Sequence, residues 1–318
     1  MRAALSALSR ITAAPALALL LVSVVPAQAA EFTVTSDLVG EMAEHRIADG
    51  ETLIGLPQRF SLGYTELVAG NPGVDPWMPA VGTRIVLPGA HLLPPGRREG
   101  IVINLAQQRL FLFSRDGKTV KTFPVGVGRQ GWETPPGQTR VIRKRKDPVW
   151  RPPASIRKEQ PDLPAAIGPG PNNPLGRFAL DLGWASYLLH GTNNPLGVGR
   201  RVSHGCLRLY PADIEYLFDK VTIGTSVTIL DSPVLVGWHD GQLYLEAHPS
   251  QAQADQVEWG EAMQPVPVST VFPMVEAAAG PWLQQVDWPL VNSILAARRG
   301  IPIPITPPVA KSGAGGTS

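Results

Sequence analysis

The sequence predicts a mainly β protein, with an antiparallel, sandwich-like domain that follows a small α+β module. Glycine (32) and proline (33) together supply about a fifth of the 318 residues, which favours turns and strands over long helices. Short apolar runs rich in β-branched and aromatic residues follow one another closely, with turn signals between them. Hydrophobic residues make up 44% of the chain and charged residues 17%, which argues against intrinsic disorder.

Charge and cysteine content narrow the classes of function. The formal net charge of +2 argues against a nucleic-acid binder that depends on bulk positive charge. The single cysteine, Cys206, excludes a disulfide framework within the chain and any structural zinc site built from several thiolates. A free cysteine is most often a small buried hydrophobic residue, so its neighbours decide whether Cys206 is reactive.

Residues 1–29 are typical of a secretory signal peptide. Arg2 and Arg10 give a positively charged start, residues 13–25 are almost wholly apolar, and Ala27-Gln28-Ala29 has the small-x-small form of a cleavage site. The apolar core of about 13 residues is shorter than the roughly 20 residues needed to span a bilayer, although an uncleaved anchor is the alternative. We therefore expect an exported protein.

Residues 31–91 are predicted to form a compact module with a strand, two short helices and a closing strand. Asp49-Gly50-Glu51-Thr52-Leu53 opens a helical pattern, Asn71-Pro72-Gly73 marks a turn, and Ile85-Val86-Leu87-Pro88 ends the closing strand. Together with Leu67-Val68-Ala69-Gly70, these segments resemble LysM domains, which bind glycans that contain N-acetylglucosamine. The resemblance implies a peptidoglycan-binding module, and the alternative is a packing subdomain without a ligand.

A polar linker at residues 94–100 leads into a second domain, which we place at residues 98–231. Closely spaced strands with Asp-Gly and similar turns are typical of an antiparallel sandwich or barrel. The predicted elements are strands at 101–105, 109–113, 120–127 and 227–230, and a helix at 214–218.

Within this domain, residues 140–146 carry five basic side chains and precede a segment that contains Trp150. One interpretation is a solvated strand with its loop. The other is a cationic flap, with an aromatic side chain, beside a site for an acidic substrate.

The remainder of the chain gives weaker signals. Residues 232–300 form a C-terminal segment of unknown role, with a strand pair expected around Asp240-Gly241 and a helix expected near 282–299. The proline-, glycine- and serine-rich residues 301–318 are predicted to be a flexible tail.

The residues that carry chemistry lie in His190-Gly191-Thr192 and, ten residues later, in Ser203-His204-Gly205-Cys206-Leu207-Arg208. A thiol must lose its proton before it attacks a carbonyl, because its free pKa is about 8.5. A nearby imidazole accepts that proton, and Arg208 favours the thiolate electrostatically. Gly205 permits close approach of the backbone to a substrate, and successive N–H groups in such a turn form an oxyanion hole. No Asp or Asn motif orients the histidine, so a neighbouring backbone carbonyl is the candidate.

These two stretches resemble the signature of the L,D-transpeptidase family of the YkuD type. Pro135-Pro136-Gly137, Trp150 with Pro152-Pro153, and Asn173-Pro174-Leu175-Gly176 agree with it. The resemblance covers roughly residues 98–230. With the LysM-like module ahead of it, the layout resembles the periplasmic Gram-negative enzymes that anchor Braun's lipoprotein to peptidoglycan.

The resemblance implies a role for each residue of the motif. Cys206 is the nucleophile, His190 is the base, and the carbonyl of Gly191 orients His190. The N–H groups of Gly205 and Cys206 face the oxyanion. Whether His204 assists catalysis or only lines the pocket stays open, and it ranks below His190 as the base. The residues expected to bind substrate are Ser203, His204, Arg208, Thr192 and Trp150.

The family's reaction implies the substrate and the products. Cys206 attacks the L-centre carbonyl of meso-diaminopimelate in a peptidoglycan tetrapeptide stem, D-alanine leaves, and an amine resolves the thioester. A lysine of an outer-membrane protein is the favoured acceptor, while a second stem gives a 3–3 cross-link and water gives L,D-carboxypeptidase activity. The resemblance implies no metal and no organic cofactor, and a periplasmic location.

Two interpretations from other classes remain. One is a non-catalytic wall protein in which the LysM-like module binds glycan and Cys206 has no chemical role. The other is a cysteine hydrolase that acts on a different amide.

Overall fold

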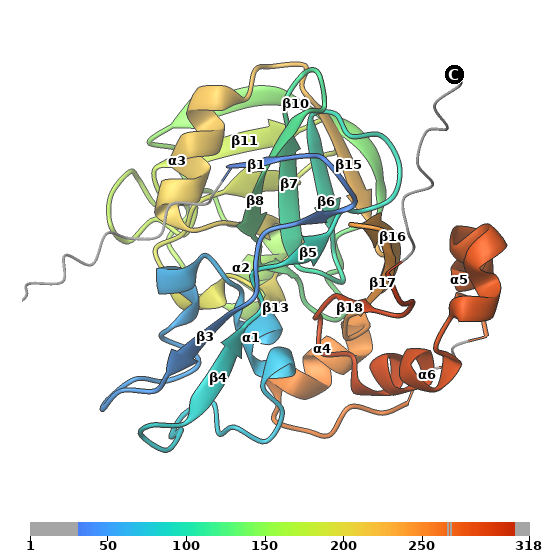
Figure 1. Ribbon diagram of the computed structural model, residues 1–318. Helices are drawn as coiled ribbons and strands as arrows, with labels where there is room; N and C mark the ends of the chain where they lie inside the picture. The colour runs from blue at the N-terminus through green and yellow to red at the C-terminus, as the bar shows by residue number, and fades with distance from the viewer. Residues whose placement is uncertain (1–30, 266, 268, 309–318) are drawn as a thin grey trace, which may run out of the picture.

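The computed structural model describes residues 31–265, 267 and 269–308, and the predicted signal peptide lies outside these residues. Three units are visible in Figure 1: a large sheet with helix α3 beside it, a small unit around β3, β4 and α1, and a C-terminal unit with helices α4, α5 and α6. Among the described helices, none has the length and apolar character that crossing a membrane requires.

The large sheet contains nine strands of the described chain in the order β1-β8-β7-β6-β15-β10-β11-β12-β14. Its apolar runs agree with the predicted strands, including the hairpins that join β6, β7 and β8. The strands are β1 (Glu31–Thr33), β6 (Ile101–Asn104), β7 (Arg109–Phe113), β8 (Thr119–Pro124), β10 (Gly137–Lys146), β11 (Phe178–Leu182), β12 (Leu188–His190), β14 (Leu207–Arg208) and β15 (Ser226–Leu230).

The catalytic domain is rich in strands as predicted, but its main sheet is one curled sheet with two parallel pairings rather than an antiparallel sandwich. β15 follows helix α3 (Pro211–Lys220) and returns beside β6, so this pair is parallel, as is β12 with β14. The first half of β10, Gly137–Arg140, pairs with β15, whereas residues 141–146 pair with β11. An irregularity between Val141 and Arg143 marks this change. The strand therefore passes from one part of the sheet to the other.

The main core lies inside this curl. Both parts of the sheet contribute fully buried side chains, among them Ile103 and Leu189, and α3 adds Ile214 and Leu217. Ile214 and Leu217 are three residues apart, so they lie on one face of the helix. Pro211 in the first turn has no N–H to leave unpaired, and Asp213 in the same turn faces the positive end of the helix dipole.

The small N-terminal unit has the predicted order of a strand, two short helices and a strand. β3 and β4 pair antiparallel around a core that includes Leu53, Leu67 and Ile85. Residues 31–33 differ from the predicted module boundary, because β1 pairs with β8 at the edge of the large sheet. The elements are β2 (Leu38–Val39), β3 (Ala43–Arg46), η1 (Pro57–Phe60), α1 (Tyr64–Gly70), β4 (Arg84–Leu87) and β5 (His91–Leu92), with β2 paired to β5.

The C-terminal unit has a core of its own beneath a β16-β17-β18 sheet. The strand pair expected around Asp240-Gly241 is present, and α6 falls within the predicted helix. The first part of the predicted flexible tail is ordered instead, because Ile303–Pro304 pairs with β17 and Ile305 is buried; residues 309–318 lie outside the described residues. The elements are β16 (Val234–His239), β17 (Gln242–Ala247), α4 (Gln251–Glu258), α5 (Val271–Ala279), η3 (Gly280–Gln285), α6 (Trp288–Ala297) and β18 (Ile303–Pro304).

Four short elements lie in the loops around the large sheet. β9 and β13 pair in parallel, and α2 lies in the long segment between β10 and β11. They are β9 (Val127–Gly128), α2 (Ala154–Glu159), η2 (Pro195–Gly197) and β13 (Arg201–Ser203).

A buried ion pair joins the N-terminal unit to the large sheet. Arg109 of β7 donates through Nη2 to both carboxylate oxygens of Glu66 in α1, at 2.9 and 2.7 Å. The Glu66 carboxylate also accepts from the amide of Gly63, and Arg109 also donates to Thr122. Both charged side chains are almost fully buried, so each depends on the other for its charge partner.

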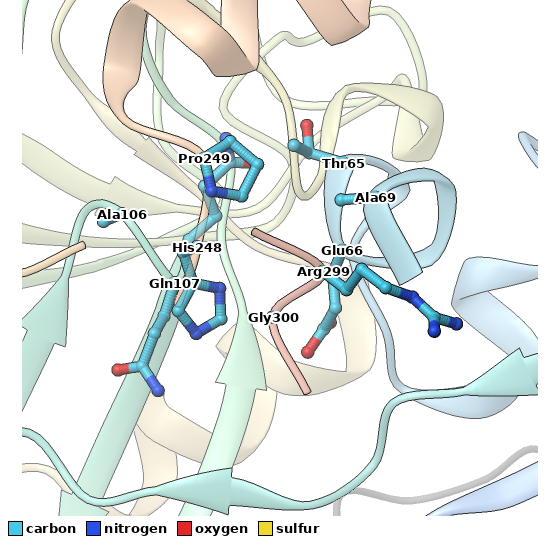
Figure 2. A pocket seen from close by; sticks show the side chains of 10 residues that line it. Thr65, Glu66, Ala69, Ala106, Gln107, His248, Pro249, Arg299 and Gly300 are labelled. Carbon is cyan, nitrogen blue, oxygen red and sulfur yellow. The ribbon is translucent and has the colours of Figure 1, made fainter. Parts of the chain in front are cut away.

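A second buried carboxylate, Glu246 of β17, joins the C-terminal unit to the same region. It accepts from the amide of Leu92 at 2.5 Å, from Gln107 Nε2 at 3.2 Å and from His248 Nε2 at 2.5 Å. Figure 2 shows Glu66, Gln107 and His248 around one cavity of about 10 Å³, room for roughly a single water molecule. The three units therefore meet at a packed polar junction.

Arg109→Ala is expected to destabilise the whole protein, because it leaves the Glu66 carboxylate buried without its cation. We expect the free energy of unfolding to fall by about 3–5 kcal/mol, measured by urea denaturation. Arg97→Ala is the control, since Arg97 pairs with Glu99 at the surface and should change stability little or not at all. Equal urea midpoints for Arg109→Ala and the wild type would show that the Glu66–Arg109 ion pair does not stabilise the junction.

Candidate active site

The candidate site lies on one face of the strands β10, β11, β12 and β14. Side chains alternate between the two faces of a strand, and Leu180, Leu189 and Leu207 face the main core. Asp181, His190 and Arg208, one residue away in each strand, must therefore face the other way. The same four strands thus present an apolar face to the core and a polar, charged face on the opposite side.

The register of the sheet brings Cys206 and His190 together on that polar face. Leu189 pairs with Leu207, so Cys206 stands beside Leu188 in the neighbouring strand, and His190 stands beside Arg208. Cys206 and His190 are thus diagonal neighbours, and the strand spacing and rise place their Cα atoms roughly 8 Å apart. A thiol and an imidazole can meet across that separation.

The turn before Cys206 is held by side chains on both sides. Ser203 Oγ donates to the carbonyl of Cys206 at 2.6 Å, and Thr134 Oγ1 donates to the carbonyl of Gly205 at 2.9 Å. Gly205 has a φ of +93°, and a Cβ there would lie 3.1 Å from the ring of Tyr187. The positive φ therefore favours glycine at this position, and a side chain would also have to displace the Tyr187 ring slightly.

Two backbone amides of this turn are available to a substrate. The carbonyls of Gly205 and Cys206 are occupied by Thr134 and Ser203, while neither residue's N–H donates to another group of the described chain. Adjacent free amides are the usual components of an oxyanion hole. These are the two N–H groups that the family resemblance implies face the oxyanion.

His190 is oriented by the carbonyl of the next residue, as the resemblance implies. Its Nδ1–H donates to Gly191 O at 2.5 Å, so Nε2 is the acceptor nitrogen of the neutral ring. Burial lowers the pKa of His190 to about 3, with a further contribution from the charge of Arg208, although the Gly191 carbonyl acts in the opposite direction. His190 is therefore neutral at physiological pH and able to accept a proton.

The Cys206 thiol is protonated in the resting protein. Its Sγ–H donates to the carbonyl of Ser186 at 3.3 Å. Burial raises the pKa of the thiol above its ordinary value, and this outweighs the opposite effects of the Leu188 amide and of Arg208 and Arg145. A neutral thiol and a neutral imidazole thus stand on the same sheet face, which suits general-base activation rather than a preformed ion pair.

The other residues predicted to bind substrate lie at different distances from the Cys206 turn. Arg208 stands beside His190, and its Nε is buried without a hydrogen-bond partner in the described chain. Thr192 Oγ1 bonds with the backbone of Asn194 and so shapes the loop after His190. Trp150 lies between β10 and β11 and pairs through its backbone with Ile167. No hydrogen bond, ion pair or ring contact of the described residues joins Trp150 to Cys206.

His204 turns toward a different group of side chains. Its Nε2 lies 3.0 Å from Glu159 of α2, and its ring lies edge-on to Trp132 at 5.1 Å between centroids. Arg129 donates to both oxygens of Glu159, at 2.9 and 2.7 Å. This cluster links α2 to the turn that carries Cys206.

Sequence reasoning missed Thr134, Asp181 and Ser186. Asp181 is a buried charge in an otherwise apolar strand, and that exception was the signal available in the sequence. Thr134 and Ser186 act through hydrogen bonds from distant loops, for which the sequence carries no signal. No three His, Cys, Asp or Glu side chains of the described residues lie close enough together to hold a metal ion.

The raised pKa of Cys206 predicts a steep pH dependence of its alkylation. Iodoacetamide is uncharged and reacts with the thiolate, so the rate should rise about tenfold per pH unit over roughly pH 6 to 8. Intact-mass measurement follows the reaction, and Cys206→Ser is the blank because the chain has one cysteine. A rate that stays level at low pH would instead indicate a preformed thiolate–imidazolium pair.

Comparison with known proteins places the chain in a family. Residues 98–229 match YkuD, described as the L,D-transpeptidase catalytic domain. The protein named "Probable L,D-transpeptidase ErfK/SrfK" of Salmonella typhimurium is 38% identical over 279 residues, which are 85% of this chain and 88% of that protein. "Probable L,D-transpeptidase YcfS" of Escherichia coli is 35% identical over 280 residues, 85% of either protein.

Solved structures of L,D-transpeptidases also match, at lower similarity. L,D-transpeptidase 3 from Mycobacterium tuberculosis has 20% identity and a TM-score of 0.35, over 46% of this chain and 67% of that one. The catalytic domain of an L,D-transpeptidase from E. faecium has 21% identity and a TM-score of 0.33, over 42% and 96%. Because the relatives from Salmonella and Escherichia are matched over most of their length, this chain belongs to the L,D-transpeptidase family of enzymes.

Proposed function

We propose that this enzyme acts on the tetrapeptide stems of peptidoglycan through a thioester on Cys206. Cys206 Sγ attacks the L-centre carbonyl of meso-diaminopimelate, and terminal D-alanine leaves as the free amino acid. The observation that carries this proposal is that the half-buried Cys206 thiol and the neutral His190 imidazole stand on one sheet face, with no hydrogen bond to Nε2 among the described residues. The family supplies the substrate class.

The proposed steps use one proton acceptor throughout. As Sγ attacks, His190 Nε2 takes the thiol proton, and the N–H groups of Gly205 and Cys206 donate to the oxyanion. When the intermediate collapses, the imidazolium gives that proton to the departing nitrogen of D-alanine. An acceptor amine then attacks the thioester, loses its proton to His190, and the proton passes to the departing thiolate.

Other residues of the motif support the site in different ways. Ser203 and Thr192 act by holding the two loops, because their hydroxyls are occupied by backbone groups. Arg208 supplies positive charge beside His190. Trp150 and His204 are proposed to line the substrate groove, with His204 held by Glu159 rather than by the thiol.

The acceptor amine is proposed to be a lysine of an outer-membrane protein. The support is the layout of the chain, since the matched relatives align with 85% of it, well beyond the catalytic domain at residues 98–229. A second stem would give a 3–3 cross-link, and water would give L,D-carboxypeptidase activity. These three outcomes share the first half-reaction and differ in the product.

Residues 31–91 are proposed to hold the enzyme on the glycan strands. The support is the strand, two short helices and strand from β3 to β4, together with the resemblance of these segments to LysM domains. Attachment to glycan raises the local concentration of stems at Cys206. Residues 1–29 are proposed to direct export to the periplasm, where these substrates occur.

Intact-mass measurement detects the first half-reaction directly, because acylation of Cys206 adds the mass of the stem to the protein. Mature protein incubated with a disaccharide-tetrapeptide should gain the mass of the acylated stem and release D-alanine, whereas Cys206→Ala should do neither. His190→Gln should retain the fold and lose activity about 100-fold or more, because the general base is missing. Adding a lysine-containing peptide, a second stem or no amine then identifies the acceptor.

Two outcomes would contradict the proposal. Folded, reduced wild-type protein that gains no mass and releases no D-alanine would contradict the thioester mechanism. Release of D-alanine by Cys206→Ala at the wild-type rate would show that another residue performs the chemistry.

Thr134→Val is expected to lower the rate without unfolding the protein. It removes the hydroxyl that binds both the Gly205 carbonyl and the Gly128 amide, so the turn that presents Cys206 loses its position. We expect D-alanine release to fall about 100-fold, as small displacements of reacting groups do. Thr119→Val is the control, since Thr119 bonds with Glu31 at the exposed sheet edge. A wild-type rate in folded Thr134→Val would show that this hydrogen bond is dispensable.

A further inference from the structure

The basic run in β10 is divided between the two faces of the sheet. Lys144 points toward helix α3, where its Nζ donates to the carbonyl of Val221 and lies over the ring of Phe218. Arg143 and Arg145 lie on the opposite face, which is the face of Cys206 and His190. The proposed mechanism assigns neither arginine a role.

Arg145 and His190 stand in the same row across the sheet. Arg145 pairs with Ala179 of β11, Ala179 pairs with His190 of β12, and His190 pairs with Arg208 of β14. Two strand spacings separate the Cα atoms of Arg145 and His190, roughly 10 Å. The Arg145 side chain reaches past Ala179 to Asp181, which pairs with Leu188, the residue beside Cys206 in the sheet.

Asp181 fixes the direction of the Arg145 guanidinium. Arg145 donates to Asp181 Oδ1 through Nε at 3.0 Å and through Nη2 at 2.8 Å, while Arg143 donates to Oδ2 through Nε. The Asp181 side chain is only 7% exposed, whereas that of Arg145 is 24% exposed. Arg145 is therefore anchored at one edge of its guanidinium and reachable at the other, where Nη1 has no partner among the described residues.

The charges on this face do not cancel. One carboxylate, Asp181, faces two guanidinium groups, and Arg208 adds a third on the far side of His190. Arg143 already provides Asp181 with one cation, so neutralising Asp181 does not require Arg145. The excess positive charge beside the nucleophile suits an anionic group on the substrate.

We propose that the free edge of the Arg145 guanidinium binds a carboxylate of the donor stem and so makes the enzyme selective for unamidated stems. This inference rests on the proposed function. The stem carries a carboxylate on its terminal D-alanine and another on the D-centre of diaminopimelate. Both lie near the scissile bond, and the planar guanidinium suits either of them.

The test compares Arg145→Gln with the wild type on three synthetic disaccharide-tetrapeptides. One is unmodified, one ends in D-alaninamide, and one has a carboxamide at the D-centre of diaminopimelate. On the unmodified stem, Arg145→Gln should lower kcat/KM on the order of 10- to 100-fold, the usual effect of losing a hydrogen bond between charged groups. On the stem that lacks the recognised carboxylate, the variant and the wild type should agree within about threefold. That stem identifies which carboxylate is bound.

Arg143→Gln is the matched control, because Arg143 bonds with the same Asp181 but is 65% exposed. It should stay within about threefold of the wild type on all three stems. Arg145→Lys keeps the charge and a link to Asp181 while losing the planar donor pair, so it should show a smaller loss with the same dependence on the stem. Arg145→Lys takes the place of Arg145→Gln in the test if Arg145→Gln does not fold.

Three results would overturn the inference. An equal loss on all three stems would show that Arg145 recognises neither of these two carboxylates. Wild-type activity of Arg145→Gln on the unmodified stem would show that it binds nothing there. A slower iodoacetamide reaction of Cys206 in Arg145→Gln, with that equal loss, would assign Arg145 to the thiolate instead.

Failure of the proposed function is distinguishable from failure of this inference. If the wild type releases no D-alanine from the unmodified stem, the proposed function fails. In that case, calorimetry tests the inference by measuring how tightly each of the three stems binds to Cys206→Ala and to the double variant that also carries Arg145→Gln. The inference is supported if Arg145→Gln weakens binding about tenfold or more only for stems that carry the recognised carboxylate. It is overturned if both proteins bind every stem equally well.

Discussion

The alternation of side chains in β10, β11, β12 and β14 determines both where the core lies and where the chemistry lies. Leu180, Leu189 and Leu207 are almost fully buried, so a shift of one residue in register would move them out of the core and bring Asp181 or His190 into it. The burial of each leucine stabilises the fold by about 1.5–3 kcal/mol, which opposes such a shift. The precision of the site therefore follows from the packing of the core on the opposite face.

The polar junction imposes a second constraint, on the positions of the three units. Glu66 needs Arg109 of the large sheet, and Glu246 of the C-terminal unit needs Gln107 and the amide of Leu92. Buried charges without partners are strongly unfavourable, so each unit is held where its partner groups are. If residues 31–91 bind glycan as proposed, the catalytic face is carried at a fixed position relative to the glycan strand. The short linker at residues 94–100 then acts as part of a rigid body rather than as a flexible tether.

The sequence predicted local features well and long-range pairings poorly. His190 and Cys206 stand out in the sequence because two short stretches carry recognisable chemistry, and the hairpin at Asp240-Gly241 is predicted because its turn residues favour positive φ. The Glu66–Arg109 pair was missed, because its members are 43 residues apart and their pairing depends on the packing of two units. The row that aligns Arg145 with His190 depends on an irregularity in β10, which no local pattern in the sequence announces.

The electrostatics of the site suit the expulsion of an amine more than the activation of a thiol. Burial raises the pKa of Cys206 and lowers that of His190 to about 3, so the resting pair is neutral and proton transfer must accompany attack. The same low pKa makes the imidazolium a strong acid once it forms. An amide nitrogen leaves poorly unless it is protonated, and a strongly acidic imidazolium favours that proton transfer. In the proposed mechanism, His190 is neutral again once D-alanine departs and can take a proton from the incoming amine. An environment that appears unfavourable for the nucleophile is therefore matched to the two steps in which nitrogen gains or loses a proton.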